Sequence, residues 1–258
     1  MESNKEIKVL VGVPVSEMYD YCFKEFTEGL KALTYKNKDI LLIDNSKDEN
    51  YFKKFEKEGF KVIRIQYHQK TRERVTQAHN LLRKVVLEEK YDYLLNLDQD
   101  VIPPPDAIEN LLRWNKPIVM GLYFGHHFVE QLNEQRIMPF AWIFTKRKGH
   151  WGEVRYLNPD EVFKPGLIKI AYTGAGCMFI HRSVLEKIKF RYNDRIDAWD
   201  DRWFGFDAYE NGFEVYLDNT VKCKHLYVKR PFKWEDIKKN RKDFCCIAGF
   251  KPETVGLD

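Results

Sequence analysis

The sequence predicts an α/β protein built on a doubly wound, mostly parallel sheet. Over the first hundred residues, short apolar runs typical of buried strands alternate with segments whose apolar residues recur at helical spacing. Strand–helix alternation at this pitch implies right-handed βαβ units. The chain has 258 residues and is 44% hydrophobic, which is enough for a sizeable core. It contains no linker-like segment or internal repeat, so we expect one domain with an irregular C-terminal portion.

Four short apolar runs in the first half are interpreted as buried strands. The first ends near Pro14, and the second stops at Asp44-Asn45-Ser46. The fourth is followed directly by Asp98 and, a few residues later, by three consecutive prolines. The four predicted strands cover residues 8–15, 40–43, 62–65 and 93–97.

Three helices are expected between these strands. Apolar residues from Tyr19 to Leu33 recur at intervals of three and four, which gives one apolar helical face. A short helix around Phe52 ends at Gly59, a residue typical of the position after a helix. The apolar positions of residues 75–86 predict a longer helix before the fourth strand.

The second half is less regular, and turn and capping signals carry most of its prediction. Asp106 with Glu109, and Ser183 with Glu186, each have the form of an N-capping box and predict a helix after them. The polar stretch 146–164 predicts a loop or a hairpin. The other expected elements are strands at 118–120, 141–144 and 213–217, and a helix at 201–211 that is closed by Asn211-Gly212.

Composition excludes several classes of protein. The net charge of +4 is too small, and the hydrophobic content too high, for a disordered chain. No run of about 18 apolar residues predicts a membrane span, and the N-terminus lacks the order of a secretory signal. The cysteines are odd in number without metal-ligand spacing, which favours reduced thiols and a cytoplasmic location. They are Cys22, Cys177, Cys223, Cys245 and Cys246.

Basic residues gather late in the chain, between positions 222 and 242. Such a segment is most often solvated surface, but it could also face phosphate, nucleic acid or an anionic membrane. Three aromatic residues lie among these charges, so a peripheral membrane contact stays open. They are Phe232, Trp234 and Phe244.

The chemistry is expected where the predicted strands end, because open α/β sheets bind ligands beyond the carboxyl ends of their strands. Pro14, Asp44 and the triplet Asp98-Gln99-Asp100 occupy three such ends. Two carboxylates one residue apart repel each other unless a cation lies between them. Hard oxygen ligands suit Mg²⁺ or Mn²⁺, which would also hold a diphosphate. The alternative is a solvated acidic turn.

A second cluster of polar and aromatic residues begins at Trp199-Asp200-Asp201 and includes Trp203. Carboxylates at the start of a helix are expected, because they favour the positive end of its dipole. Capping does not explain the flanking tryptophans, whose flat surfaces suit sugar rings. His225 follows the next predicted strand, although a lone histidine is more often an ordinary packed residue than a ligand.

Between about residues 8 and 226, the order of these segments resembles the GT-A glycosyltransferases, particularly the family 2-like enzymes. The sequence Asn-Leu-Asp-Gln-Asp-Val at 96–101 is similar to the strand-end D-x-D of that family. Residues 173–182 resemble its small-residue turn and strand under the acceptor, and residues 200–212 resemble its E-D-x-x-F helix. Ala-His-Asn at 78–80 is similar to its A-R-N.

The resemblance implies a GT-A fold and a metal-dependent enzyme that moves a sugar from a UDP- or GDP-sugar to an acceptor hydroxyl, with inversion. It implies that Asp201 is the catalytic base. It also implies Mn²⁺ or Mg²⁺ as cofactor, and an acceptor that is a carbohydrate, a lipid-linked molecule or a protein rather than a nucleic acid. The implied metal ligands are Asp98, Asp100 and His225.

The same resemblance implies several substrate contacts. Asp44 would accept hydrogen bonds from the base of the donor, and Arg74 would contact its diphosphate. Gly174 and Gly176 would let the backbone approach the acceptor or the sugar. The remaining residues expected to bind substrate are Pro14, Asn80, Gln99, Trp199 and Asp200.

We expect residues 1–226 to form the transferase domain and residues 227–258 to form a basic extension, or lid, packed on it. Two other classes of protein share some of these sequence features. A sugar-phosphate nucleotidyltransferase would need a glycine- and basic-rich loop after the first strand, whereas residues 12–17 contain one glycine and an acid. A non-catalytic carbohydrate- or nucleic-acid-binding protein would use the aromatic residues and the late basic segment, and would need none of the aspartates.

Overall fold

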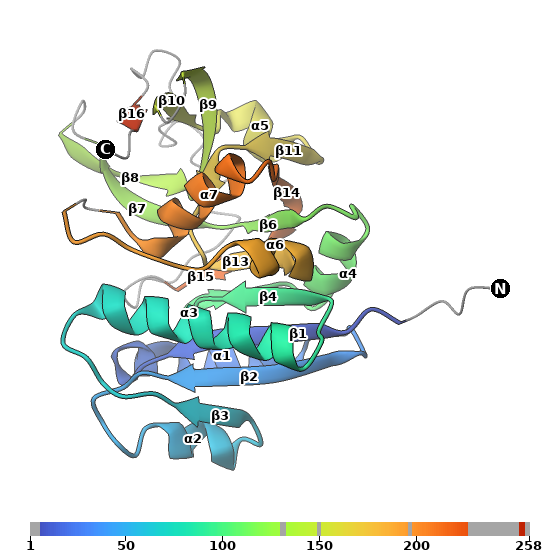
Figure 1. Ribbon diagram of the computed structural model, residues 1–258, viewed down its shortest axis with the longest axis vertical. Helices are drawn as coiled ribbons and strands as arrows, with labels where there is room; N and C mark the ends of the chain where they lie inside the picture. Colours follow the sequence, from blue (N-terminus) through green and yellow to red (C-terminus); the bar gives the residue numbers. More distant parts are fainter. Residues whose placement is uncertain (1–5, 130–132, 149–150, 196–197, 227–252, 256–258) are drawn as a thin grey trace.

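The computed structural model describes residues 6–129, 133–148, 151–195, 198–226 and 253–255. Its centre is an eight-stranded sheet with the strand order β11-β14-β6-β13-β4-β1-β2-β3 (Figure 1). Strands β3, β2, β1 and β4 run parallel to one another, and β6 runs parallel to β14. Strand β13 is antiparallel to both of its neighbours, and β11 is antiparallel to β14. The predicted mostly parallel α/β sheet is therefore confirmed, with two antiparallel insertions.

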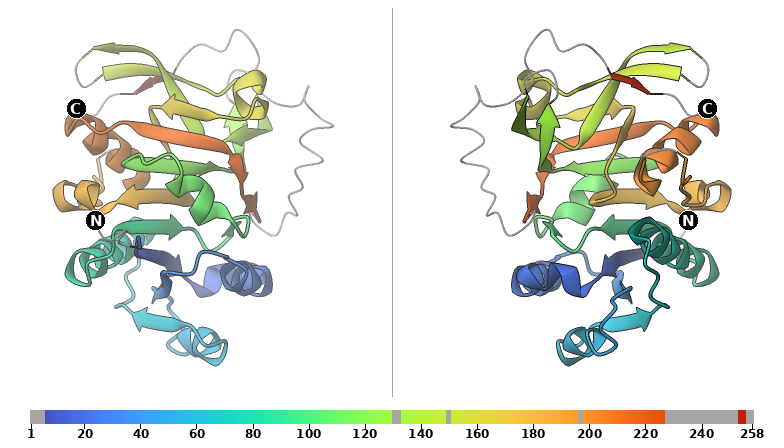
Figure 2. Two further views of the ribbon diagram at one scale, coloured as in Figure 1. Left: turned by 90° about the vertical axis from the view of Figure 1, so that its right-hand side faces the viewer. Right: turned by 90° about the vertical axis from the view of Figure 1, so that its left-hand side faces the viewer.

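Helices cover both faces of this sheet. Helices α3, α6 and α7 lie on one face, and α1 and α4 lie on the other (Figure 2). Successive side chains of each strand therefore meet an apolar layer on either side. Leu10 of β1 packs toward Ala78 and Leu82 of α3, whereas Val11 packs into the second core with Phe26 of α1. Both faces of the central strands are buried, which explains their nearly continuous apolar sequence.

The elements as far as α4 follow the predicted order, whereas strand β11 and helix α5 in the second half were not predicted. The strands are β1 (Val9–Val15), β2 (Lys38–Asp44), β3 (Lys61–Arg64), β4 (Tyr93–Leu97), β6 (Ile118–Leu122), β11 (Leu167–Ile170), β13 (Cys177–His181) and β14 (Val215–Lys222). The helices are the 3₁₀ helix η1 (Glu17–Cys22), α1 (Phe23–Lys31), α2 (Phe52–Lys57), α3 (Thr71–Glu88), α4 (Ala107–Leu112), α5 (Pro159–Phe163), α6 (Arg182–Lys187) and α7 (Asp200–Glu210).

Smaller sheets lie at one end of the large one. The predicted loop or hairpin at 146–164 is a hairpin followed by helix α5, and it belongs to a four-stranded sheet ordered β12-β9-β10-β16. Its strands are β9 (Ala141–Lys148), β10 (Trp151–Tyr156), β12 (Tyr172–Thr173) and β16 (Glu253–Val255). Two further pairs join β7 (Phe124–Val129) to β8 (Glu134–Pro139), and β5 (Val101–Ile102) to β15 (Lys224–His225).

Both predicted capping boxes are wrong. Asp106 precedes α4, but its side chain makes no capping hydrogen bond. Helix α6 begins two residues earlier than predicted, and its cap is the side chain of His181, which accepts from the backbone N–H of Ser183. An imidazole nitrogen replaces the hydroxyl oxygen in the same role, so a search for Ser, Thr, Asp or Asn misses it.

Most of the C-terminal extension lies outside the described residues, including the aromatic residues on which a membrane contact would depend. The predicted lid and the boundary at residue 226 therefore stay predictions. Residues 253–255 pair with β10. In the described ranges, no helix is both long and apolar enough to cross a membrane. Cys22, Cys177 and Cys223 are free thiols, in agreement with the predicted reduced cysteines, and the cytoplasmic location stays a prediction.

Candidate active site

A cleft of about 270 Å³ lies beyond the carboxyl ends of β1 and β4. It is the position at which a sheet of this kind binds ligands. The first turn of α7 and the β5–β15 pair complete its walls. The residues that line it include Pro14 and the polar or aromatic side chains of Ser16, Tyr19, Asn45, Thr71, Arg74, His79, Asp98, Gln99, Asp100, Phe140, Trp199, Asp200, Asp201 and His225.

The two aspartates of the triplet and His225 meet because of one short strand pair. Strand β15 runs antiparallel to β5 and places His225 opposite Val101. The backbone N–H of Leu226 donates to the carbonyl oxygen of Asp100 at 2.8 Å and fixes the same register. As a result, the His225 Nε2 atom lies 3.4 Å from Asp100 Oδ2, although 125 residues separate them in the chain.

His225 is oriented as a metal ligand would be. Its Nδ1–H donates to the carbonyl oxygen of Phe124 at 2.6 Å, so Nε2 is the nitrogen that faces Asp100. A backbone carbonyl on one imidazole nitrogen is the usual outer contact of a metal-binding histidine. Burial opposes a positive charge on His225, and Asp100 favours it, so its pKa lies above the ordinary value. Either a proton on Nε2 or a bound cation would favour the close approach of His225 Nε2 to Asp100 Oδ2.

The donor set fits a hard divalent cation that is also held by substrate. Within the described residues, no group of three or more His, Cys, Asp or Glu side chains is arranged to hold a metal by itself. Mg²⁺ and its analogues commonly take one or two carboxylates and complete their shell with water and substrate phosphates. Asp100 and His225, with Asp98 nearby, match that mode of binding.

The ionised form of the Asp98 carboxyl is disfavoured in this cleft, and a bound cation would favour it. Burial and the like charge of Asp100 raise its pKa to about 6. A carboxyl group with this pKa is partly protonated near neutral pH. A bound divalent cation would favour the ionised form of both carboxyls.

The acidic pair at the start of α7 divides into a buried member and a partly exposed one. Asp200 is 3% exposed, and its Oδ2 lies 2.7 Å from Nδ1 of His79. Asp201 keeps part of its surface open to the cleft, and its Oδ1 accepts the backbone N–H of Arg202. Burial, together with the charges of Asp200 and Asp98, raises the pKa of Asp201 to about 7. Asp201 can therefore accept a proton near neutral pH.

The cleft is also lined by three residues that were expected to bind substrate, Pro14, Arg74 and Trp199. Trp199 is 44% exposed directly before the acidic pair, so its ring is available to a ligand. Arg74 is 4% exposed, and its guanidinium donates to the backbone oxygens of His68 and Gln69. Its Nε is buried and has no hydrogen-bond partner among the described residues.

Gln99 lines the cleft but uses its amide within the protein. Its Oε1 accepts the backbone N–H of Ser16 at 2.8 Å, and its Nε2 donates to the hydroxyl of Tyr51 at 3.0 Å. These bonds join the ends of β1 and β4. The amide is therefore placed to shape the cleft rather than to reach a ligand.

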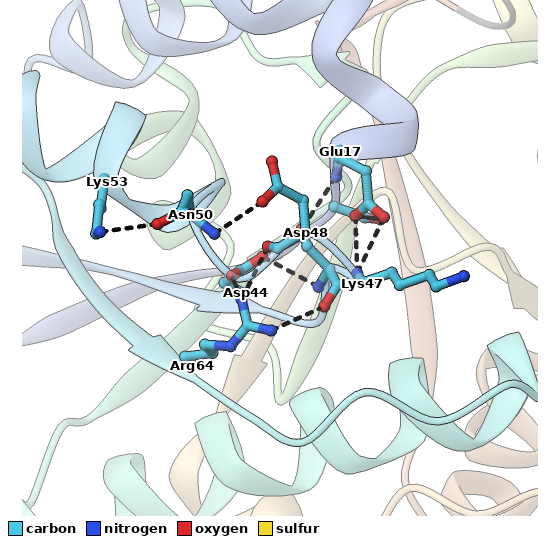
Figure 3. Close-up of polar contacts among 9 residues, drawn as sticks. Glu17, Asp44, Lys47, Asp48, Asn50, Lys53 and Arg64 are labelled. Atoms are coloured by element: carbon cyan, nitrogen blue, oxygen red, sulfur yellow. Dashed lines mark hydrogen bonds and ion pairs between the residues drawn. The ribbon is translucent and has the colours of Figure 1, made fainter.

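The structure does not place Asp44 in the cleft. Its side chain has no exposed surface, because Arg64 and the backbone N–H of Ser46 occupy its two oxygens (Figure 3). Burial raises the pKa of Asp44, and Arg64 opposes that effect. A direct hydrogen bond from a nucleobase to Asp44 would require Arg64 to move away.

Asn80 is also not among the residues that line the cleft, in contrast to its predicted role. Its side-chain amide donates to the backbone oxygen of Phe190 at 2.8 Å and accepts the N–H of the same residue at 3.1 Å. Asn80 therefore ties α3 to the segment that leads to α7. Its neighbour His79 faces the cleft instead.

The two glycines of the 173–182 segment make room for the side chain of Tyr123. A Cβ atom on Gly174 would lie 2.2 Å from the hydroxyl oxygen of Tyr123, and one on Gly176 would lie 2.7 Å from its Cζ. The Tyr123 ring stacks on Phe140 and meets His225 edge-on, with ring centroids 5.4 Å apart. The small residues thus let Tyr123 pack against His225, and their approach to the acceptor or the sugar stays a prediction.

Sequence reasoning missed His79 as a member of the site. The only signal was its place between Ala78 and Asn80 on the buried face of α3, where a histidine reads as an ordinary core residue. Its partner Asp200 lies 121 positions away, so no local pattern connects the two.

The comparisons with known proteins agree with this geometry. The family model for glycosyl transferase family 2 matches residues 22–189, about two thirds of the chain. No curated protein sequence matches the chain. Among solved structures, the crystal structure of GalNAc-T7 with UDP, GalNAc and Mn²⁺ is similar with a TM-score of 0.58 and 13% identity, over 86% of this chain and 44% of that one.

The crystal structure of A197 from STIV is similar over 87% of this chain and 88% of that one, with 16% identity and a TM-score of 0.45. This chain spans less than half of the GalNAc-T7 structure, and that likeness supports the fold alone. The match to the family model, together with the sheet described above, establishes the GT-A fold. The chain belongs to glycosyl transferase family 2.

Proposed function

We propose that this glycosyltransferase is metal-dependent and moves a sugar from a nucleoside-diphosphate sugar to an acceptor hydroxyl, with inversion at the anomeric carbon. The observation that carries the proposal is that Asp98, Asp100, His225 and Asp201 line one cleft although they come from three distant parts of the chain. A carbohydrate-binding protein would have no need to bring these groups together.

Asp100 and His225, with Asp98, would hold Mn²⁺ or Mg²⁺ at the donor diphosphate. When bound, such a cation stabilises the negative charge that develops on a departing nucleoside diphosphate. Arg74, which lines the cleft, is the residue proposed to contact the diphosphate. UDP- and GDP-sugars are the donor classes to be tested, and Arg64 must release Asp44 for a direct contact to the base.

Asp201 is proposed as the general base. The acceptor oxygen attacks the anomeric carbon, the bond between that carbon and the diphosphate oxygen breaks, and the acceptor proton passes to the Asp201 carboxylate. A base whose pKa is about 7 suits this transfer, because it is ionised at neutral pH and still binds a proton well. One displacement at the anomeric carbon inverts its configuration.

Trp199 is proposed to pack on the apolar face of a sugar at the cleft mouth. Its ring is exposed, and it directly precedes the residue pair that contains the base. A large aromatic surface contributes binding energy with little loss of conformational freedom. Acceptors that fit this role are a carbohydrate, or a lipid-linked molecule or protein that already carries a sugar.

The experiment that tests the proposal is a screen of nucleotide sugars and acceptors with Mn²⁺, read by mass spectrometry, followed by comparison of variants. Asp201→Asn should lower turnover by about 10²–10⁴-fold, the usual contribution of a general base. Asp160→Asn is the matched control, because Asp160 also lies in the first turn of a helix but outside the cleft. Full turnover in Asp201→Asn would remove the base from this residue.

A further inference from the structure

His79 belongs to a buried chain of polar contacts that ends at the catalytic helix. Its side chain is fully buried in the middle of α3, and its Nδ1 lies 2.7 Å from Asp200 Oδ2. Its Nε2 lies 3.3 Å from the side-chain nitrogen of Asn96 on β4. That nitrogen also donates to the backbone oxygen of Ala175 at 2.9 Å. Side chains from β4, α3 and α7 are thus joined beneath the cleft.

This chain of contacts holds the first turn of α7 against α3. Trp199 occupies the N-cap position and makes no capping hydrogen bond. Asp200 directs its carboxylate away from the helix, to the imidazole of α3. Whether His79 is neutral or protonated, its Nδ1–H donates to this carboxylate. A charge-assisted bond of this length holds both side chains in one orientation.

The His79 ring is itself held in place by aromatic packing. Its centroid lies 4.7 Å from that of Phe190, and Phe190 stacks on Phe204 of α7 at 4.7 Å. The imidazole therefore has the Phe190 ring, which is backed by Phe204 of α7, on one side and the Asp200 carboxylate at its Nδ1. Asp201 is the next residue in the chain, and its backbone follows the position of Asp200.

We propose that His79 is a positioning residue, which holds Asp200 and thereby sets the direction in which the Asp201 carboxylate enters the cleft. The inference rests on the proposed role of Asp201 as the base. A displacement of about 1 Å in a catalytic group can lower turnover by about 100-fold. A residue that served only to stabilise the fold would have no such effect on the folded fraction of the enzyme.

The test compares two substitutions of nearly equal size, His79→Asn and His79→Leu. Asparagine places an N–H donor close to the position of Nδ1, whereas leucine offers none. His79→Leu should lower kcat by about 10- to 100-fold, and His79→Asn should recover most of that loss. The affinity for UDP or GDP with Mn²⁺, measured by calorimetry, should be the same in both variants. An equal fall of kcat in the two variants would overturn the proposal, and so would an equal fall in donor affinity.

A control and a second variant separate positioning from loss of folding. His181→Asn replaces a histidine that caps α6 outside the cleft, and it should leave kcat unchanged. If His79→Leu does not fold, the double variant His79→Leu/Asp200→Leu replaces the buried pair by apolar side chains of similar size, which cores often accept. That double variant should bind the donor, but its kcat should be low because the start of α7 is no longer held by the bond between His79 and Asp200. Full kcat in the double variant would contradict the proposal.

A readout without turnover makes the test independent of the acceptor. With ¹³C-labelled aspartate, the Asp201 carboxyl signal is assigned by its absence in Asp201→Asn. The signal should move in His79→Leu and stay near its original position in His79→Asn; an unmoved signal in His79→Leu would overturn the inference.

Failure of the proposed base and failure of the positioning role give different results. If Asp201→Asn keeps full turnover, the proposed base is wrong whatever the His79 variants show. If Asp201→Asn is inactive and His79→Leu is fully active, only the positioning role fails.

Discussion

Replacing Asp201 by asparagine should stabilise the folded protein at high pH while it removes the base. The pKa of Asp201 rises from its ordinary value of 3.8 to about 7, chiefly because of burial and then because of the neighbouring Asp200. One pKa unit corresponds to about 1.4 kcal/mol, so the unscreened cost of ionising Asp201 in the folded state is about 4 kcal/mol. The side chain is partly open to the cleft, and water screening reduces this to about 1–2 kcal/mol.

The sign of the pH dependence follows from the direction of the pKa change. Below about pH 4, the carboxyl is neutral in both the folded and the unfolded chain, and the substitution removes no charge. As the pH rises through about 7, the folded wild type must hold an unfavourable anion, whereas the asparagine variant does not. The variant should therefore gain stability relative to wild type between pH 5 and pH 8.

Urea denaturation of both proteins at pH 5, 6.5 and 8 measures this difference directly. The free energy of unfolding of Asp201→Asn should exceed that of wild type by about 1–2 kcal/mol at pH 8 and by less at pH 5. Asp160→Asn should show no such pH-dependent gain. A variant of Asp201 that is no more stable than wild type at pH 8 would refute the assignment of a strained carboxylate to this position.

Three further predictions follow from the contacts described. Gly176→Ala should cost about 1–3 kcal/mol of stability by forcing Tyr123 to shift, whereas Gly166→Ala, with nothing within 4 Å, should be near neutral in the same urea experiment. Asn80→Ala should cost about 1–3 kcal/mol by unpairing the buried backbone of Phe190, and a loss of donor affinity by calorimetry would show that it binds substrate after all. Deletion of residues 227–258 should raise the donor KM if the extension is a lid, and unchanged donor kinetics would reject the lid.

The sequence was sufficient for the parallel part of the fold because each strand there is buried on both faces. The runs at 8–15 and 93–97 contain little but apolar residues, and they became β1 and β4 with nearly the predicted bounds. The antiparallel direction of β13 was not predictable, because an apolar strand has the same sequence pattern in either direction. Strand order depends on contacts between distant segments, which local periodicity does not contain.

The residues of the site also divide into those that the sequence indicated and those that only the structure reveals. Asp98 and Asp100 were found because they end a strand, and the structure brings His225 to them through the pairing of β15 with β5. Asp44 satisfied the same strand-end rule, but Arg64 on the neighbouring strand occupies it, and that pairing is visible only in three dimensions. No local pattern assigns His79 a role in the site, since its contact is with an aspartate that is 121 positions away.

The central claim is that Asp100 and its neighbours hold a divalent cation together with a nucleoside diphosphate, while Asp201 serves the transfer step. Calorimetric titration of UDP and GDP into wild type, Asp100→Ala and Asp201→Asn, each with Mn²⁺ and with EDTA, tests it most directly. Wild type and Asp201→Asn should bind one of the two nucleotides only in the presence of Mn²⁺, and Asp100→Ala should lose that binding. Binding that survives EDTA unchanged, or that is as tight in Asp100→Ala as in wild type, would contradict the account.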